Sequence, residues 1–370
     1  MLYLDNSATS IRKPLSVYRS FFYNTLFNSA NAGRGSHMPS LRALNGILNA
    51  QESAARLFNV DNPMNIAFTY NATYALNMAI LGAAGDGHII ATQMDHNSVL
   101  RPVFRHGNYT IVSADTRGHV SPWDVEFAIR PDTRLVICTH ASNVCGTMQS
   151  VKEIAKIAHR HGALFLLDAA QTAGCFPIDA EDIGADFIAF SGHKGLMGPL
   201  GTGGLYVRDP STLEPVITGG TGSQSESMHH PLIMPDMLHP GTVNAPGVAA
   251  LGSAIDFILD YGVDAIGERE RGMANMLHDN LMNMDNISVY GDYERTGAVA
   301  FNIKGLGSEE TGERIGNRAV VRAGYHCAPL AHKALGTHNT GAVRASFGFY
   351  NTMRDVKIFT DIVYKASRGI

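Results

Sequence analysis

Residues 135–168 read LVICTHASNVCGTMQSVKEIAKIAHRHGALFLLD, and this stretch decides the fold. It opens with the apolar run 135–138 and closes with a second apolar run, 163–168, which ends in Asp168. Short apolar runs bounded by polar residues and turn signals are typical of buried strands. Asp168 is therefore expected at the carboxyl end of a strand.

The segment between these two runs has the pattern of a helix. Ser150 and Glu153 are spaced as a capping box at its start, and Gly162 ends it. Its apolar side chains recur at helical spacing, at Val151, Ile154, Ala155 and Ala158. Strand, helix and strand in this order predict a βαβ unit with parallel strands, and hence an α/β protein with a mostly parallel sheet.

Further strand-like runs lie at 88–90, 187–190 and 204–207, and the last two are separated by a glycine-rich segment. Ligands of open α/β sheets bind beyond the carboxyl ends of the strands. Asp168 and the residues after Phe190 are therefore expected to line one crevice.

The pattern changes near residue 286 to that of a smaller α+β domain, whose last helix has Thr352 and Asp355 as caps. We expect a large α/β domain over 15–264 and a small α+β domain over 265–370, joined by the N-terminal segment 1–14. The strand-like runs of the small domain are 287–290, 298–303 and 342–346.

The composition excludes several classes of protein. Of 370 residues, 45% are hydrophobic, and the net charge of −4 gives no basic field for nucleic acid or an anionic membrane. The four cysteines form no CxxC pair, and neither a signal peptide nor a membrane-spanning stretch is indicated. We expect a cytoplasmic protein with a small-molecule substrate and no nucleic-acid or membrane partner.

Motifs for nucleotide and metal chemistry are missing. No G-x-G-x-x-G occurs, no lysine follows a glycine as a P-loop requires, and no H-E-x-x-H is present. No metal site is therefore expected.

The segment 191–195, Ser-Gly-His-Lys-Gly, places Lys194 directly after a strand. Lys194 is either a solvated loop lysine or a Schiff-base lysine that holds a carbonyl cofactor. Pyridoxal 5′-phosphate (PLP) needs a carboxylate facing its ring nitrogen, and Asp168, otherwise a helix cap, meets this need.

Other residues complete the pattern for PLP. Gln171 is placed to bond the phenolic oxygen, and His96 is either a satisfied loop histidine or stacks on the ring. Thr73 precedes a helical stretch and is a phosphate ligand or an ordinary N-cap. Ser191 and His193 would complete the phosphate site.

These residues, in this order, resemble the class V aminotransferase group of fold-type I PLP enzymes, in the cysteine desulfurase and selenocysteine lyase branch. The opening 3–9 is similar to the start of that family, and 31–37 to the stretch near its substrate entrance. The residues that match its cofactor motifs are His96, Asn143, Asp168, Gln171, Ser191, His193 and Lys194.

The resemblance implies a homodimer in which segment 240–244 reaches the neighbouring site and Thr242 contacts the neighbour's phosphate. It also implies that Arg344, in the segment 341–346, clamps the substrate carboxylate in a bidentate manner. The remaining substrate-binding residues that it implies are Asn143, His37 and Arg322.

The segment 322–328 is similar to the persulfide-forming segment of group II (SufS-like) desulfurases, with Cys327 as the sulfur acceptor. Arg322, His326 and His332 would favour its thiolate. A lone cysteine of this kind is otherwise a buried filler. The chain departs from the family in being shorter and in having Ala72 where a second threonine is expected.

The expected activity is that of a PLP-dependent cysteine desulfurase, which converts L-cysteine to L-alanine and leaves a persulfide on Cys327. Lys194, Cys327 and His96 are the expected catalytic residues. The alternatives are a selenocysteine lyase, another class V aminotransferase or C–S lyase, and a non-catalytic PLP-binding sulfur-relay scaffold. A sulfur-acceptor protein, as in iron–sulfur cluster assembly, is a further expected partner.

Overall fold

The computed structural model describes residues 2–32 and 35–370. Its centre is a seven-stranded sheet of order β2-β8-β7-β6-β5-β3-β4, in which only β8 runs antiparallel to its neighbours. The strands are β2 (Ile66–Thr69), β3 (His88–Thr92), β4 (Tyr109–Val112), β5 (Thr133–Thr139), β6 (Leu164–Asp168), β7 (Phe187–Ser191) and β8 (Gly203–Val207). The predicted α/β class with a mostly parallel sheet is confirmed.

Helices cover both faces of this sheet. Successive strand residues point to opposite sides, so each strand contributes side chains to two apolar cores. In β5, Val136 and Cys138 pack into one apolar core, whereas Leu135 and Ile137 pack into the other. The first core includes side chains of α2 (Met38–Phe58), α6 (Val151–Arg160) and α8 (Ala245–Tyr261), and the second those of α3 (Ala72–Ala84) and α4 (Asn97–His106). The remaining α-helices among the described residues up to 262 are α1 (Leu15–Phe27), α5 (Pro122–Ala128) and α7 (Ala180–Ile183).

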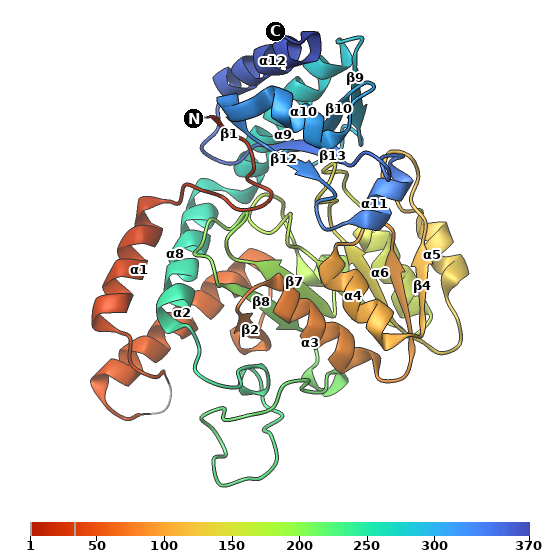
Figure 1. Ribbon diagram of the computed structural model, residues 1–370. Helices are drawn as coiled ribbons and strands as arrows, with labels where there is room; N and C mark the ends of the chain where they lie inside the picture. Colours follow the sequence, from red (N-terminus) through yellow and green to blue (C-terminus); the bar gives the residue numbers. More distant parts are fainter. Residues whose placement is uncertain (1, 33–34) are drawn as a thin grey trace.

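The small domain is built on a four-stranded antiparallel sheet, β12-β13-β10-β9, and Figure 1 shows both chain ends beside it. β1 (Leu2–Tyr3) pairs with β11 (Ala319–Val320) and ties the N-terminal segment to this domain. The other elements are α9 (Val263–Met282), β9 (Ile287–Tyr290), β10 (Ala298–Ile303), α10 (Ser308–Ile315), β12 (Arg322–Gly324), α11 (Pro329–Ala334), β13 (Ala342–Ser346) and α12 (Met353–Arg368).

Two predicted helix starts have different outcomes. α12 begins with the capping box of Thr352 and Asp355, as predicted. At α6 the prediction is wrong: Ser150 makes no side-chain cap hydrogen bond, and its ψ of 59° departs from the extended conformation that N-caps adopt. The domain boundary at residue 265 lies in the first turn of α9 and stays a prediction.

Across residues 2–32 and 35–370, no helix has the length and apolarity needed to span a membrane.

Candidate active site

Side chains capable of chemistry follow the carboxyl ends of the parallel strands. Asp168 is the last residue of β6, Lys194 follows β7, and His96 follows β3. β7, β6, β5 and β3 are successive neighbours in the sheet, so the three residues lie along one edge of it. The charge of Lys194 affects the pKa of both other groups. The crevice expected from the strand order is therefore present.

Lys194 is the centre of this site. Burial, with a smaller contribution from the charges of Arg344 and Arg322, lowers the pKa of its amine to about 8, although Asp168 and Cys327 act in the opposite direction. A lysine with such a pKa is a base and a nucleophile near neutral pH.

Asp168 is buried at the end of β6, and burial raises the pKa of its carboxyl group, against the Ala170 amide and Lys194. Its Oδ1 accepts a hydrogen bond from that amide at 3.0 Å. No described residue donates a hydrogen bond to Oδ2, so this oxygen is left for a ligand.

His96 is the N-cap of α4, and its Nδ1 accepts a hydrogen bond from the Ser98 amide at 3.0 Å. Burial, together with Lys194 and two arginines, lowers the pKa of His96 to about 4. The ring is therefore neutral at physiological pH, and its proton lies on Nε2.

Ser98 also connects His96 to α3. Its Oγ lies 2.9 Å from His96 Nδ1 and 2.8 Å from Oγ1 of Thr73, in the first turn of α3. Asn71 caps this helix, so the alternative reading of Thr73 as the N-cap is wrong. A helix N-terminus with a hydroxyl in its first turn is suited to a phosphate.

The N-terminal segment holds the loop around Lys194. The carbonyl of His193 accepts hydrogen bonds from Ser10 N at 3.0 Å and from Lys13 Nζ at 3.2 Å. Ser191 is buried at the end of β7, and Gln171 Nε2 donates to the Ser7 carbonyl at 3.2 Å.

Arg344 on β13 is 2% exposed and connects three parts of the chain. Its Nη2 donates to Asp5 Oδ1 at 2.8 Å and its Nη1 to the Asn143 carbonyl at 2.7 Å. Its Nε is buried and has no partner among the described residues. Arg322 lies opposite Arg344 in β12, with Nε 3.6 Å from Asp5 Oδ2.

Cys327 is the one exposed cysteine of the four, all of which are described. It lies on the short segment between β12 and α11, where His326 and Cys327 both have positive φ, 51° and 56°. Two donors of the large domain hold this strained backbone: Asn97 N bonds the Cys327 carbonyl at 2.8 Å, and Asn143 Nδ2 bonds the His326 carbonyl at 2.6 Å.

The histidines near Cys327 do not supply the charge expected of them. Burial lowers the pKa of His326 to about 3 and that of His332 to about 4, so both are neutral. Their rings lie side by side, with Nδ1 of His326 3.4 Å from Nε2 of His332. Of the three groups expected to favour the thiolate, only Arg322 is a cation.

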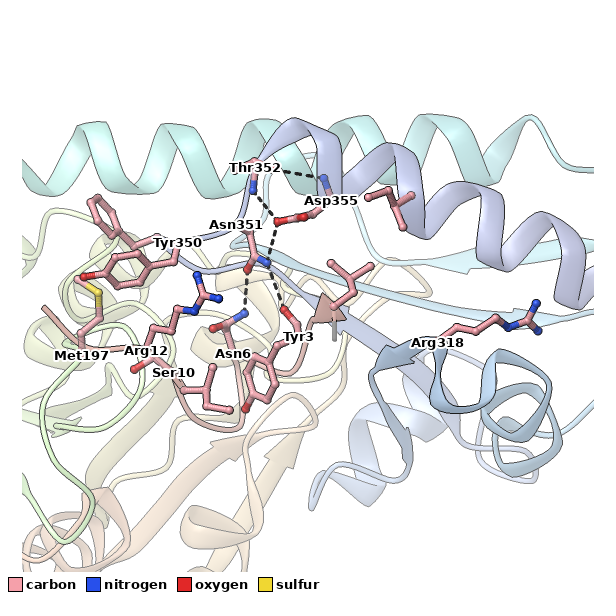
Figure 2. A pocket seen from close by; sticks show the side chains of 14 residues that line it. Tyr3, Asn6, Ser10, Arg12, Met197, Arg318, Tyr350, Asn351, Thr352 and Asp355 are labelled. Atoms are coloured by element: carbon pink, nitrogen blue, oxygen red, sulfur yellow. Dashed lines mark hydrogen bonds between the residues drawn. The ribbon is translucent and has the colours of Figure 1, made fainter.

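The N-terminal segment is fixed to the small domain by a network that Figure 2 shows. Asn6 Nδ2 donates to Asn351 Oδ1 at 3.0 Å, and Asn351 Nδ2 donates to the Tyr3 carbonyl at 3.2 Å. Tyr3, Asn6 and Asn351 line a polar groove of about 560 Å³, together with Arg12 and Asp355. They hold the neighbouring Asp5 in place beside Arg344.

Two predicted residues make no hydrogen bond to the described residues around Lys194. Thr242 is exposed in the loop before α8 and lines an apolar pocket of about 220 Å³ with Tyr70 and Tyr74. His37 caps α2, and its Nδ1 accepts from Ser40 N at 3.3 Å. Of the entrance stretch 31–37, Gly33 and Arg34 lie outside the described residues.

Three polar residues of the site were not predicted from the sequence: Asp5, Ser98 and Asp95. The fully buried Asp95 joins two strands, since Oδ2 accepts from Thr92 N at 2.6 Å and Oδ1 from Thr139 N at 2.7 Å. Its place immediately before His96 was the available signal, as was that of Ser98 two residues after His96, whereas Arg344, the partner of Asp5, is distant in sequence.

The residues present fit PLP. Three buried polar atoms near Lys194 lack hydrogen-bond partners among the described residues, namely His193 Nδ1, Asn143 Oδ1 and Arg344 Nε. Such atoms are costly unless a ligand satisfies them. Together with the amine of Lys194, Oδ2 of Asp168 and the N-terminus of α3, they match an aldehyde, a ring nitrogen, a phosphate and a substrate carboxylate.

Comparison with known proteins supports this assignment. The model of the family "Aminotransferase class-V" matches residues 2–359. A probable cysteine desulfurase of Methanothermobacter thermautotrophicus is 37% identical, over 96% of this chain and 92% of the relative. Another, of Halalkalibacterium halodurans, is also 37% identical, over 96% and 90%.

Two solved structures are similar over the whole chain. The apo cysteine desulfurase of Thermococcus onnurineus NA1 has a TM-score of 0.93 at 31% identity, covering 100% of this chain and 95% of that one. The cysteine desulfurase CsdA of Escherichia coli has a TM-score of 0.89 at 26% identity, with the same coverage. The chain thus belongs to the class V aminotransferase family of PLP-dependent enzymes and is a relative of the cysteine desulfurases.

Proposed function

We propose that this protein is a cysteine desulfurase that moves the sulfur of L-cysteine onto Cys327 and releases L-alanine. The observation that carries the proposal is the position of Cys327: it is exposed, and donors of the large domain hold the backbone on which it lies. An ordinary aminotransferase has no use for a thiol held in this way.

The residues that would hold PLP are those already brought together around Lys194. Lys194 would bind its aldehyde, Asp168 its ring nitrogen and Gln171 its phenolic oxygen, with His96 on the ring face. Thr73, Ser191 and His193 would hold the phosphate. When bound, PLP supplies an electron sink for the substrate's α-carbon.

The chain's own groups would then carry out the remaining chemistry. Arg344, with Asn143 and Arg322, binds the substrate carboxylate, and the Lys194 amine takes the α-proton. Asp168 would keep a proton on the ring nitrogen of bound PLP.

The Cys327 thiolate attacks the substrate sulfur. The Cβ–Sγ bond breaks, a bond forms between the two sulfurs, and Cβ gains a proton to give alanine. His96 Nε2–H would donate a hydrogen bond near the substrate sulfur.

The geometry also supports the subtype and the assembly. The short segment that carries Cys327 is what a group II enzyme requires, and delivery from such a segment calls for a sulfur-acceptor protein. α1 exposes a run of aromatic and aliphatic side chains that a second copy would cover, namely Tyr18, Phe22, Tyr23, Leu26 and Phe27. We therefore propose a homodimer in which His37 and Thr242 act at the partner's site.

The unpaired state of all four cysteines supports a reducing compartment, the cytoplasm.

Peptide mass analysis after incubation with L-cysteine tests the function directly. One extra sulfur on the peptide of Cys327 is expected, and none on that of Cys175, which is buried. Wild-type protein that releases alanine without sulfur on Cys327 would contradict the proposal.

A further inference from the structure

The carbonyl oxygen of His193, one residue before Lys194, accepts hydrogen bonds from four donors of the N-terminal segment. Ser10 supplies two of them, its amide at 3.0 Å and its hydroxyl at 3.1 Å. Thr9 Oγ1 and Lys13 Nζ each donate at 3.2 Å. A carbonyl oxygen has only two lone pairs, so the donors gathered on this oxygen exceed what one acceptor needs.

Lys13 is the charged member of these donors, and it is half-buried. Its Nζ also donates to Ser10 Oγ at 2.7 Å, which directs the Ser10 hydroxyl toward the same carbonyl. No carboxylate of the described residues forms an ion pair with Lys13, and burial alone lowers the pKa of its amine to about 8. The charge of Lys13 is thus directed at one peptide carbonyl.

His193 after β7 and Tyr18 on α1 are titratable residues that lie beside Lys13. Burial, together with the charges of Lys194 and Lys13, lowers the pKa of His193 to about 4, so its ring is neutral. The Tyr18 hydroxyl accepts a hydrogen bond from Lys13 N at 3.3 Å. Neither residue offers a carboxylate, so the His193 carbonyl keeps the ammonium group of Lys13.

The bonded carbonyl determines how Lys194 leaves the main chain. The carbonyl of His193 and the amide of Lys194 belong to one rigid peptide plane, so fixing the oxygen fixes the orientation of that plane. On the other side, the Lys194 carbonyl accepts a hydrogen bond from Met197 N at 2.9 Å. The backbone of Lys194 is therefore held both before and after its side chain.

We propose that Lys13 is a positioning residue for Lys194: its ammonium group holds the His193 carbonyl and so keeps the Lys194 amine directed toward the PLP aldehyde. This inference rests on the proposed function, because it takes Lys194 as the residue that binds PLP. Lys13 acts through the main chain, since its Nζ bonds the carbonyl and the Ser10 hydroxyl.

The test measures how fast PLP becomes linked to Lys194 in the full chain freed of cofactor. Borohydride makes the link permanent at timed intervals, and peptide mass analysis then counts the labelled Lys194. Lys13→Met keeps a side chain of similar length without the ammonium group, and its linking rate is expected to fall about tenfold at pH 7. Arg12→Met removes the neighbouring exposed cation and is expected to leave the rate unchanged.

Lys13→Arg distinguishes this role from a merely structural one. Arginine stays charged at every pH used, whereas the Lys13 amine loses its proton near pH 8 and then bonds the carbonyl more weakly. The ratio of the two rates cancels the titration of Lys194, which both proteins share. Lys13→Arg is expected to match the wild type within about twofold at pH 7 and to exceed it about threefold at pH 9.

A Lys13→Met variant that links PLP as fast as the wild type would overturn the proposal, and so would equal losses in Lys13→Met and Arg12→Met. A ratio of Lys13→Arg to wild type that stays constant from pH 7 to pH 9 would show that the charge of Lys13 has no part in placing Lys194, and would also overturn it. If Lys13→Met does not fold, this ratio decides alone.

The linking rate does not depend on turnover. A wild-type protein that is labelled on Lys194 but releases no alanine from L-cysteine would refute the proposed function and leave the role of Lys13 standing. A wild-type protein without any label on Lys194 would overturn both.

Discussion

The side-chain amide of Asn143 donates a 2.6 Å hydrogen bond to the carbonyl of His326, the residue before Cys327. This bond joins the large-domain loop after β5 to the segment that carries the reactive thiol, which lies in a strained backbone conformation. The position of Cys327 thus depends on a residue far away in sequence.

Replacing Asn143 by Asp removes this donor and places a carboxylate against a carbonyl. We expect the rate of persulfide formation to fall about tenfold or more, because the thiol is no longer held toward the substrate. The measurement is kcat and KM for alanine release. A KM that rises while kcat stays constant would mean that Asn143 acts only on the substrate carboxylate.

Ser98→Ala removes the hydroxyl between Thr73 and His96. PLP affinity is expected to drop about fivefold, because Thr73 then loses the partner that orients it at the N-terminus of α3. Cofactor retention after dialysis checks this, with the exposed Ser211→Ala as a control. Equal retention in the two variants would remove Ser98 from the phosphate site.

Glu270 on α9 gives a prediction about stability and pH. It is 8% exposed, and burial raises the pKa of its carboxyl group from 4.5 to about 8. Between these two values the folded protein keeps a proton that the unfolded chain loses, so Glu270 makes stability fall as the pH rises from about 4.5 to 8.

Glu270→Gln is therefore expected to stabilise the protein by roughly 2–4 kcal/mol at pH 8 relative to its effect at pH 5. Chemical denaturation at the two pH values measures this, with the exposed Glu268→Gln on the same helix as the matched control. A gain that is equal at both pH values would contradict a neutral, buried Glu270.

The proposed dimer predicts a change in oligomeric state. Phe22→Glu places a charge on the exposed apolar face of α1, where Phe22 is 67% exposed, and is expected to shift the protein from dimer to monomer in sedimentation. Phe127→Glu on α5 is the control, since Phe127 is exposed but lies on another helix. Identical sedimentation of the two variants would place the interface elsewhere.

The strands around the site could be predicted because they are short apolar runs with polar residues at their ends. Asp168 and Lys194 therefore came from pattern and strand order, and the structure brings them together. The α6 cap shows the limit of such patterns, because spacing alone does not set the backbone angle of Ser150.

No local sequence pattern predicted the contacts between segments that are distant in the chain. Asp5 meets Arg344 only because β1 pairs with β11 and residue 5 bridges to Ser346. The neutral state of His326 likewise follows from burial, which the sequence around it does not reveal. The contact between Asp5 and Arg344 and the neutral state of His326 can therefore be seen only in the folded chain.

The most direct test of the account is alanine release from L-cysteine and from L-selenocysteine by wild-type protein and Cys327→Ala. The account predicts many turnovers per subunit by the wild type on L-cysteine and loss of that activity in Cys327→Ala, because no other cysteine is exposed to accept the sulfur. A Cys327→Ala variant as active as the wild type on L-cysteine would contradict it.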